Sequence, residues 1–277
     1  MKKLTEEEVF DLQTGSGQRN ISDEDRHFFD TMGYLVLEDL LAASQAAEAR
    51  HGLENMVACA PPKIRVHRER PSELELLNVI ESGGIFEDAM ALPRVLSYLG
   101  ELIWGNQFRL IASRGTVRNP GSLRPLSQGG RADARRYVRY RCFREGEFRC
   151  LMLTCLIALS DTRSGDGTFC LIPASHKSNL PHPYAEMNLD DVAPLREIPL
   201  RAGSGILFSE GISHAMKSPG RETQAWLSFQ YGPSYMLSWP GCEPSNELQS
   251  RVAHDASKAH LLIQPYYHPP ESQKKGM

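Results

Sequence analysis

The spacing of hydrophobic and polar positions along this chain changes near residue 104. From Ser22 to about Trp104, apolar residues recur at the three- and four-residue spacing of helices. From Gln107 onward they alternate with polar residues or form short continuous runs, which is typical of strands. The pattern therefore predicts a helical first part followed by a part built from strands.

Helix boundary signals refine the first part. Ser22 is a candidate N-cap with Asp25 three positions later, and Gly33 is a candidate end of this helix, before the short strand "YLVLEDL". The Ala-rich stretch "AASQAAEARHGLENMVACA" predicts a second helix. In "LPRVLSYLGELIW", Pro93 stands near the start of a third. We expect these helices to cover a sheet, whereas "IRVHRERPSELELLNVIESGG" between them has a mixed pattern.

The second part contains seven or eight short strands separated by Gly- and Pro-containing turns. The predicted strands lie in "QFRLIASRGTVRN", "RRYVRYRCF", "FRCLMLTCLIALSD", "GTFCLIPAS", "LREIPLRAG", "GILFSEG" and "QAWLSFQYGPSYM". Many short strands after a helical preface predict a mainly β protein with helical cover, a jelly roll or related double-sheet barrel.

One domain is expected from the length of 277 residues and the 41% hydrophobic content. We expect an N-terminal extension over residues 1–21 and a single domain over 22–242, with helical cover at 22–104 and a barrel at 105–242. The polar, Pro- and Lys-containing stretch 243–277 is predicted to be a surface tail.

Charge and composition exclude several classes of partner. The formal net charge of −3 and the pI near 6.3 argue against a nucleic-acid binder held by overall charge. No stretch approaches the roughly 18 apolar residues of a membrane span, and the N-terminus lacks the apolar core of a signal peptide. The six cysteines form no CxxC pair and lie mostly in strand-like runs. We expect a cytoplasmic protein with reduced thiols and no membrane partner.

Three stretches resemble one branch of a known superfamily. They are "MGYLVLEDLL", "GDGTFCLIPASHKSNLP" and "RAGSGILFSEGISHAMKSPGRE". Together they are similar to the opening strand, the "PGSHK" element and the distal-His element of the phytanoyl-CoA dioxygenase-like Fe(II)/2-oxoglutarate oxygenases. The resemblance covers roughly residues 22 to 240 and implies a double-stranded β-helix, the cupin-like form of the jelly roll.

The resemblance also implies a cofactor site. Its members hold Fe(II) with a His-x-Asp/Glu pair and a distal His, the facial triad of non-haem oxygenases. An Arg beyond the distal His holds the far carboxylate of 2-oxoglutarate through a bidentate contact. By this resemblance His214, expected on a short loop after a strand end, is the distal metal ligand.

The remaining site positions depart from the pattern. In "PLSQGG", Ser127 or Gln128 stands where the first His is expected, with glycine near the acid position. A shifted alignment makes "RAD" the degenerate pair and leaves Asp133 as a candidate carboxylate ligand. Arg cannot bind a metal, so the candidate ligands are His214 and Asp133, with Gln128 as a weak third. The 2-oxoglutarate Arg is expected at 223–225, and the nearest one, Arg221, lies a few residues early.

An arginine-rich stretch adjoins this region. In "RRYVRYRCF", alternation places Arg139 and Arg141 on one face of the predicted strand. If that face points into the barrel, the two cations are candidate contacts for an anionic substrate. If it points outward, they form a solvated face beside nearby acids, which is the reading that we favour.

Three functions remain open from the sequence. The first is a metal-free enzyme that acts on a small, possibly anionic metabolite in an isomerase-, cyclase- or lyase-type step, with His214 as its acid or base. The second is an active Fe(II)/2-oxoglutarate dioxygenase with an atypical metal site. The third is a non-catalytic subunit in a homo- or hetero-oligomer with a related oxygenase. The departures from the ligand pattern favour the first.

Overall fold

The structure is a computed structural model that describes residues 21–70, 72–103, 108–128, 141–144, 147–178, 180, 182–184 and 186–263. Its α-helices are α2 (Asp23–Met32), α3 (Ala43–Ala58), α4 (Ile85–Ala89), α5 (Pro93–Leu102), α7 (Asn246–Val252) and α8 (Ala256–Leu261). Its strands are β1 (Tyr34–Leu37), β2 (Arg65–Arg70), β3 (Glu73–Leu77), β4 (Phe108–Arg118), β5 (Arg124–Gln128), β6 (Arg141–Arg144), β7 (Glu147–Arg149), β8 (Leu153–Ala158), β9 (Phe169–Leu171), β10 (Arg196–Ile198), β11 (Gly205–Ser209), β12 (Ser213–Met216) and β13 (Gln224–Pro233).

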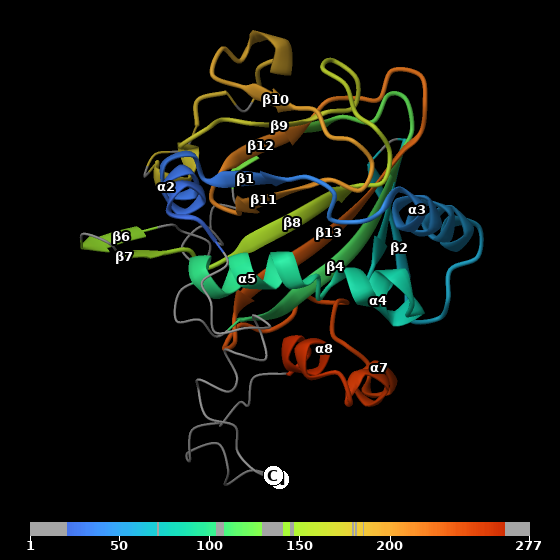
Figure 1. The fold of residues 1–277 in the computed structure, drawn as a ribbon. Coiled ribbons are helices and arrows are strands. Elements are labelled where there is room, and N and C mark those ends of the chain that lie inside the picture. The colour runs from blue at the N-terminus through green and yellow to red at the C-terminus, as the bar shows by residue number, and fades with distance from the viewer. Residues whose placement is uncertain are drawn as a thin grey trace, which may run out of the picture.

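Two antiparallel sheets make up the body of the molecule. The larger has the strand order β1-β11-β8-β13-β4-β3-β2, and the smaller has the order β10-β9-β12-β5. The smaller sheet faces one side of the larger one, and α3, α4 and α5 cover the opposite side (Figure 1). The predicted jelly roll with helical cover is confirmed, as two facing sheets and not as a closed barrel.

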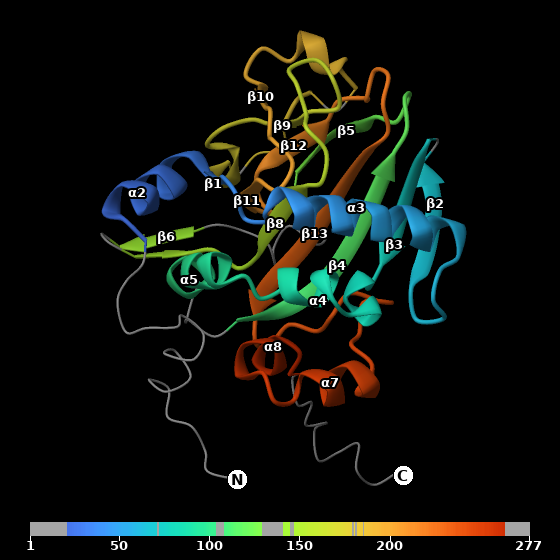
Figure 2. The same ribbon diagram turned by 45° about the vertical axis from the view of Figure 1, so that its right-hand side comes forward.

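Both faces of the larger sheet are buried, which explains the continuous apolar run of β8. Cys155 and Ile157 belong to the main core, which includes α3 and α5, whereas Leu156 and Ala158 belong to the cluster between the two sheets. Figure 2 shows α3 lying across the outer side of β3, β4 and β13. A strand covered on both sides has no need of alternating polar residues.

The helix boundaries follow the signals in the sequence. The Ser22 side chain accepts a hydrogen bond from the Asp25 N–H at 3.0 Å. Gly33 takes the left-handed conformation with φ 85° and donates its N–H to the Phe29 carbonyl, which ends α2. Pro93 is the first residue of α5. The predicted caps of α2 and the predicted start of α5 are confirmed.

Gly33 also makes room for the "PASHK" element. A Cβ atom at residue 33 would lie 2.4 Å from His176 Nδ1, and His176 Nε2 lies 3.1 Å from the Asp30 carbonyl oxygen. The imidazole is buried, and burial lowers its pKa to about 4. The end of α2 and the loop after β9 are thus packed together through one histidine ring.

Several elements were not predicted. The strands β2, β3, β5 and β12 formed no part of the expected set. His214 lies within β12, so the expected loop position is wrong.

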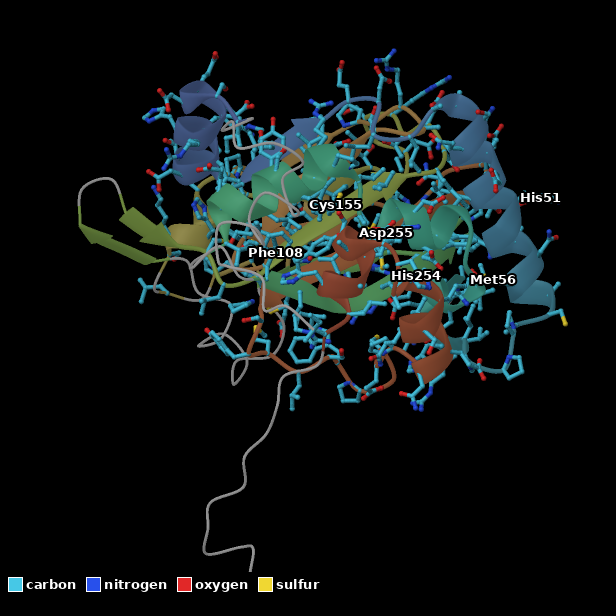
Figure 3. The ribbon with its side chains drawn as sticks, turned by 60° about the horizontal axis from the view of Figure 1, so that its bottom comes forward. His51, Met56, Phe108, Cys155, His254 and Asp255 are labelled. Atoms are coloured by element: carbon cyan, nitrogen blue, oxygen red, sulfur yellow. The ribbon has the colours of Figure 1, made fainter. Side chains whose placement is uncertain are left out.

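The segment expected to be a surface tail instead includes α7 and α8. Leu248, Val252, Leu261 and Leu262 belong to the main core. Asp255 caps α8 by accepting a hydrogen bond from the Lys258 N–H. Figure 3 shows His254 and Asp255 at the turn between these two helices. A short apolar stripe within a polar stretch was enough to bring this segment into the fold.

None of the cysteines whose side chains the structure describes forms a disulfide. Cys150, Cys155, Cys170 and Cys242 are free and buried, and Cys59 is free and exposed. Burial raises the pKa of Cys150, Cys155 and Cys170 to about 12, so these thiols remain protonated at neutral pH. No helix in the described part of the chain has both the length and the apolar character needed to cross a membrane.

Candidate functional site

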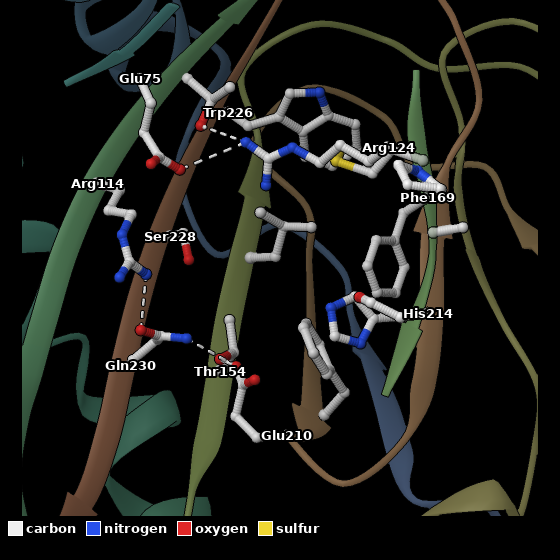
Figure 4. A pocket seen from close by; sticks show the side chains of 17 residues that line it. Glu75, Arg114, Arg124, Thr154, Phe169, Glu210, His214, Trp226, Ser228 and Gln230 are labelled. Carbon is white, nitrogen blue, oxygen red and sulfur yellow. Dashed lines mark hydrogen bonds and ion pairs between the residues drawn. The ribbon is translucent and has the colours of Figure 1, made fainter. Parts of the chain in front are cut away.

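A cavity of about 210 Å³ lies between the two sheets. The larger sheet supplies Arg114, Thr154, Trp226 and Gln230 among others, and the smaller sheet supplies His214 (Figure 4). Apolar side chains line part of the wall and charged or amide side chains line the rest. This volume is below the roughly 300–1,000 Å³ of sites for drug-sized ligands, so the enclosed space suits a small metabolite.

His214 is fixed by its own strand and by two aromatic rings. Its Nδ1 lies 3.0 Å from the Ile212 carbonyl oxygen, a contact in which a protonated Nδ1 donates. That tautomer leaves the lone pair on Nε2, which is the arrangement of a base or a metal ligand. The ring stacks on Phe169 at a centroid distance of 5.8 Å and packs against Phe208 at 5.1 Å. Figure 4 shows the imidazole beside the open space.

The strand register places a hydroxyl beside this histidine. In the smaller sheet, β12 lies between β9 and β5, and His214 pairs with Ser127 of β5. Both residues line the cavity. Ser127, one of the two alternatives for the first-ligand position, is therefore the direct neighbour of His214.

A chain of hydrogen bonds crosses the wall opposite His214. Arg114 Nη1 donates to Gln230 Oε1 at 2.6 Å, and Gln230 Nε2 donates to Glu210 Oε1 at 2.9 Å. The Thr154 hydroxyl donates to the same carboxylate oxygen, and Trp239 Nε1 donates to Gln230 Oε1 at 3.1 Å. One side-chain amide thus stands between a guanidinium and a buried carboxylate (Figure 4).

Another group of charges closes one end of the cavity. Arg124 donates to both oxygens of Glu73 at 2.9 and 3.1 Å and to Glu75 at 3.4 Å. Arg118, which is fully buried, donates to Glu73 at 3.2 Å and to the carbonyl oxygens of Ser122 and Lys217 at 3.0 Å each. These two arginines are therefore already paired with carboxylates of the protein itself.

The structure brings together few of the residues expected in the site. His214 lines the cavity. Arg221 is exposed in the turn before β13 and is not among the residues that line the cavity. The backbone of Gln128 pairs with Ser213, but its side chain lies outside the described residues. Asp133 and Arg139 lie outside them entirely, as does the side chain of Arg141 in β6.

Sequence reasoning missed Arg114, Glu210 and Gln230. A weak signal exists for two of them, because Arg114, Thr116 and Arg118 alternate with apolar residues in β4, as Trp226, Ser228 and Gln230 alternate in β13. Glu210 lies four residues before His214, in the turn between β11 and β12. Its position in the cavity is set by that turn, and no regular spacing in the sequence predicts it.

The described residues do not fit an iron and 2-oxoglutarate centre. No three His, Cys, Asp or Glu side chains of the described part of the chain lie close enough to hold a metal ion together. The register partner of His214 is Ser127, whose hydroxyl is no substitute for an imidazole ligand. No arginine projects from β13, and Trp226 lines the cavity from that strand. We therefore derive no step through iron from these residues.

Comparisons with solved structures give the fold. HygX from Streptomyces hygroscopicus, with nickel and 2-oxoglutarate bound, aligns with a TM-score of 0.69 at 22% identity, over 79% of this chain and 90% of that one. The 2-oxoglutarate-dependent epimerase SnoN from nogalamycin biosynthesis aligns with a TM-score of 0.59 at 16% identity, over 80% and 84%. The carbocyclase SnoK from the same pathway aligns with a TM-score of 0.57 at 15% identity, over 78% and 85%.

At these identities the similarity shows a shared fold. It is the fold of enzymes that bind iron or nickel, 2-oxoglutarate and small molecules. A comparison with curated protein sequences finds no match. The model of the phytanoyl-CoA dioxygenase (PhyH) family matches residues 29–218, more than half of the sequence. This chain belongs to the phytanoyl-CoA dioxygenase family.

Proposed function

We propose that this chain is an enzyme of the family that moves a proton on a small polar metabolite without using iron. The reaction is of the isomerase, cyclase or lyase type, and His214 is its acid or base. The carrying observation is the state of His214, whose Nδ1 is held by the Ile212 carbonyl oxygen and whose register partner is Ser127. A histidine held in one tautomer offers one nitrogen for proton transfer.

The surroundings of His214 support this chemistry. The ring is held on two sides by Phe169 and Phe208, so little reorganisation is needed before it reacts. Arg114 lines the same cavity and can stabilise negative charge that forms on a substrate oxygen when a proton leaves. Proton abstraction and charge stabilisation then come from opposite walls of the cavity.

The test is deuterium incorporation under metal-free conditions. Protein stripped with EDTA is incubated in D2O with a panel of small polar metabolites that carry a C–H bond next to a carbonyl, and mass spectrometry follows their mass. We expect exchange into a subset of the panel that His214→Gln abolishes and Ser127→Ala retains. Exchange that is equal in wild type and His214→Gln, or that requires added Fe(II), contradicts the proposal.

The second candidate is an Fe(II)/2-oxoglutarate dioxygenase with an atypical site. It is favoured by the same Nε2 of His214, because a metal-bound histidine also donates its other nitrogen to a carbonyl. In this alternative Asp133 or Gln128 completes the metal site, and Arg221 anchors 2-oxoglutarate after the turn before β13 rearranges.

An anaerobic titration separates the two candidates. Metal-stripped protein is titrated with Fe(II), with and without 2-oxoglutarate, while heat and the visible charge-transfer band are followed. Micromolar binding that disappears in His214→Ala supports the dioxygenase. The absence of binding in both proteins supports metal-free chemistry.

A further inference from the structure

Two opposite charges face the cavity without a direct charged partner. In the part of the chain that the structure describes, no carboxylate lies within ion-pair distance of Arg114, and its one hydrogen bond goes to the neutral amide of Gln230. Glu210 is buried, and among the described residues its carboxylate accepts hydrogen bonds from Thr154 and Gln230 alone, both neutral donors. Buried charges are normally paired, because an uncompensated charge in a low-dielectric site is costly.

The Gln230 amide keeps this pair of charges apart. Its oxygen accepts from Arg114, and its nitrogen donates to the carboxylate of Glu210. The amide is held in this orientation by Trp239, whose indole N–H donates to the same amide oxygen. Arg114 and Glu210 therefore cannot form a direct ion pair while the Gln230 amide lies between them. Among the described residues, no hydrogen bond uses the other four N–H donors of Arg114 or the second carboxylate oxygen of Glu210, and both side chains line the cavity.

The other charges around the cavity are already balanced. Arg124 and Arg118 are paired with Glu73, and Glu75 contacts Arg124. What remains for a ligand is one positive and one negative group on the same wall. A simple anion meets Arg114 but also the repulsion of Glu210, and a simple cation meets the reverse.

We propose that the cavity binds a small zwitterion of the amino-acid class, with its carboxylate on Arg114 and its ammonium group on Glu210. The volume of about 210 Å³ admits such a molecule, and Leu156 and Phe208 supply an apolar wall for its carbon chain. This proposal names the substrate class of the site proposed above. It rests on the proposed function only in calling this ligand a substrate, since binding of the ligand does not require His214 to transfer a proton.

The test is ligand-observed NMR with unbranched amino acids from glycine to 6-aminohexanoate. Each is compared with the carboxylate and the amine of the same chain length, for example 4-aminobutyrate with butyrate and butylamine. We expect one chain length to bind, and its two monovalent analogues to bind about 10- to 100-fold more weakly, the cost of one charge-assisted hydrogen bond.

Variants assign the two charges. We expect Arg114→Gln and Glu210→Gln each to weaken that ligand about 10- to 100-fold, and Arg114→Lys to retain part of the affinity. Arg201→Gln, which removes an exposed cation that is not among the residues lining the cavity, is the matched control and should change nothing. Circular dichroism checks that each variant is folded.

Three results overturn the proposal. Butyrate that binds as tightly as 4-aminobutyrate, with no effect of Glu210→Gln, makes the site an anion site. An unchanged affinity in folded Arg114→Gln would show that Arg114 does not bind the carboxylate of the ligand. The absence of binding by the whole series to folded wild-type protein excludes the zwitterion class. His214→Gln separates this proposal from the proposed function, because it should retain binding of the amino acid even where it abolishes deuterium exchange.

Discussion

Glu73 pairs with the two arginines at one end of the cavity. Its carboxylate is shared by Arg118, which is fully buried, and by Arg124. Removing one partner of a buried ion pair leaves the other charge uncompensated, which costs about 3–5 kcal/mol. We therefore expect Glu73→Gln to lower the free energy of unfolding by about 3–5 kcal/mol, measured by chemical denaturation.

Glu75→Gln is the matched control for this prediction. In the described part of the chain, Glu75 forms an ion pair with Arg124 alone, at 3.4 Å, and its side chain is 23% exposed. Pairs of this kind contribute about 0–1 kcal/mol. Equal losses in the two variants would contradict the view that burial of Arg118 determines the cost.

At the scale of the element, α7 and α8 in segment 246–262 pack into the main core, so we expect them to contribute to stability. Leu261 is buried in α8, whereas Ile263, two residues later, is 60% exposed. Truncating a buried leucine removes its packing and leaves a cavity, which costs about 2–5 kcal/mol. We expect Leu261→Ala to lower the free energy of unfolding by that amount and Ile263→Ala to change it by less than about 0.5 kcal/mol. Thermal and urea unfolding measure both changes. A similarly small effect in the two variants would show that this segment does not contribute to the stability of the fold.

The pairing of β5 with β12 makes a second prediction at this scale. Because Ser127 is the direct partner of His214, Ser127→His places two imidazoles side by side at the cavity wall. We expect this variant to gain at least about 10- to 100-fold in affinity for Ni(II) or Fe(II), measured by anaerobic calorimetry. Ser228→His, on β13 of the other sheet, is the control and should gain much less. Equal gains in the two variants would show that any added histidine suffices.

Prediction from sequence succeeded where the signal is local. The caps of α2, the proline at the start of α5 and the apolar run of β8 each carry their information within a few residues. The strands β5 and β12 have only five and four residues, and "RPLSQ" contains a proline and polar side chains. The strand conformation of β5 comes from pairing with β12, and that of β12 from pairing with β5 and β9, which no short stretch of sequence contains.

At the scale of the whole molecule, the candidate site is assembled from both sheets. His214 was found because a short motif resembles that of a known family. Arg114 lies on β4, Gln230 on β13 and Glu210 just after β11, and they meet through the pairing of β4, β13, β8 and β11. Alternation of polar residues in these strands could indicate which face is polar, but the partner across the cavity depends on how the sheets pack.

The stability of the whole molecule should fall in mild acid. Burial lowers the pKa of His176 to about 4 from an ordinary value of 6.5, and burial also lowers that of His260. The folded protein thus keeps these rings neutral while the unfolded chain binds protons. Stability is therefore complete above pH 6.5 and is lost as the pH falls towards 4.

Each pH unit in that window costs on the order of 1.4 kcal/mol for His176 alone. We expect the free energy of unfolding to drop by about 2 kcal/mol between about pH 6.5 and about pH 5. His176→Gln should be less stable at neutral pH but should lose less on acidification. A slope that is identical in the two proteins would assign the acid sensitivity to other groups.

The order of the strands along the chain affects how this protein folds during its synthesis. Tyr34 of β1 pairs with Phe208 of β11, and β4 pairs along its full length with β13. Strands this far apart in the chain must close long loops before their contacts form, which makes folding slow. While the ribosome is still translating the first two thirds of the message, β1 and β4 have no partner strand from the C-terminal third. We therefore expect the nascent chain to expose apolar strands until residue 233 has emerged, and to be most prone to aggregation before that point.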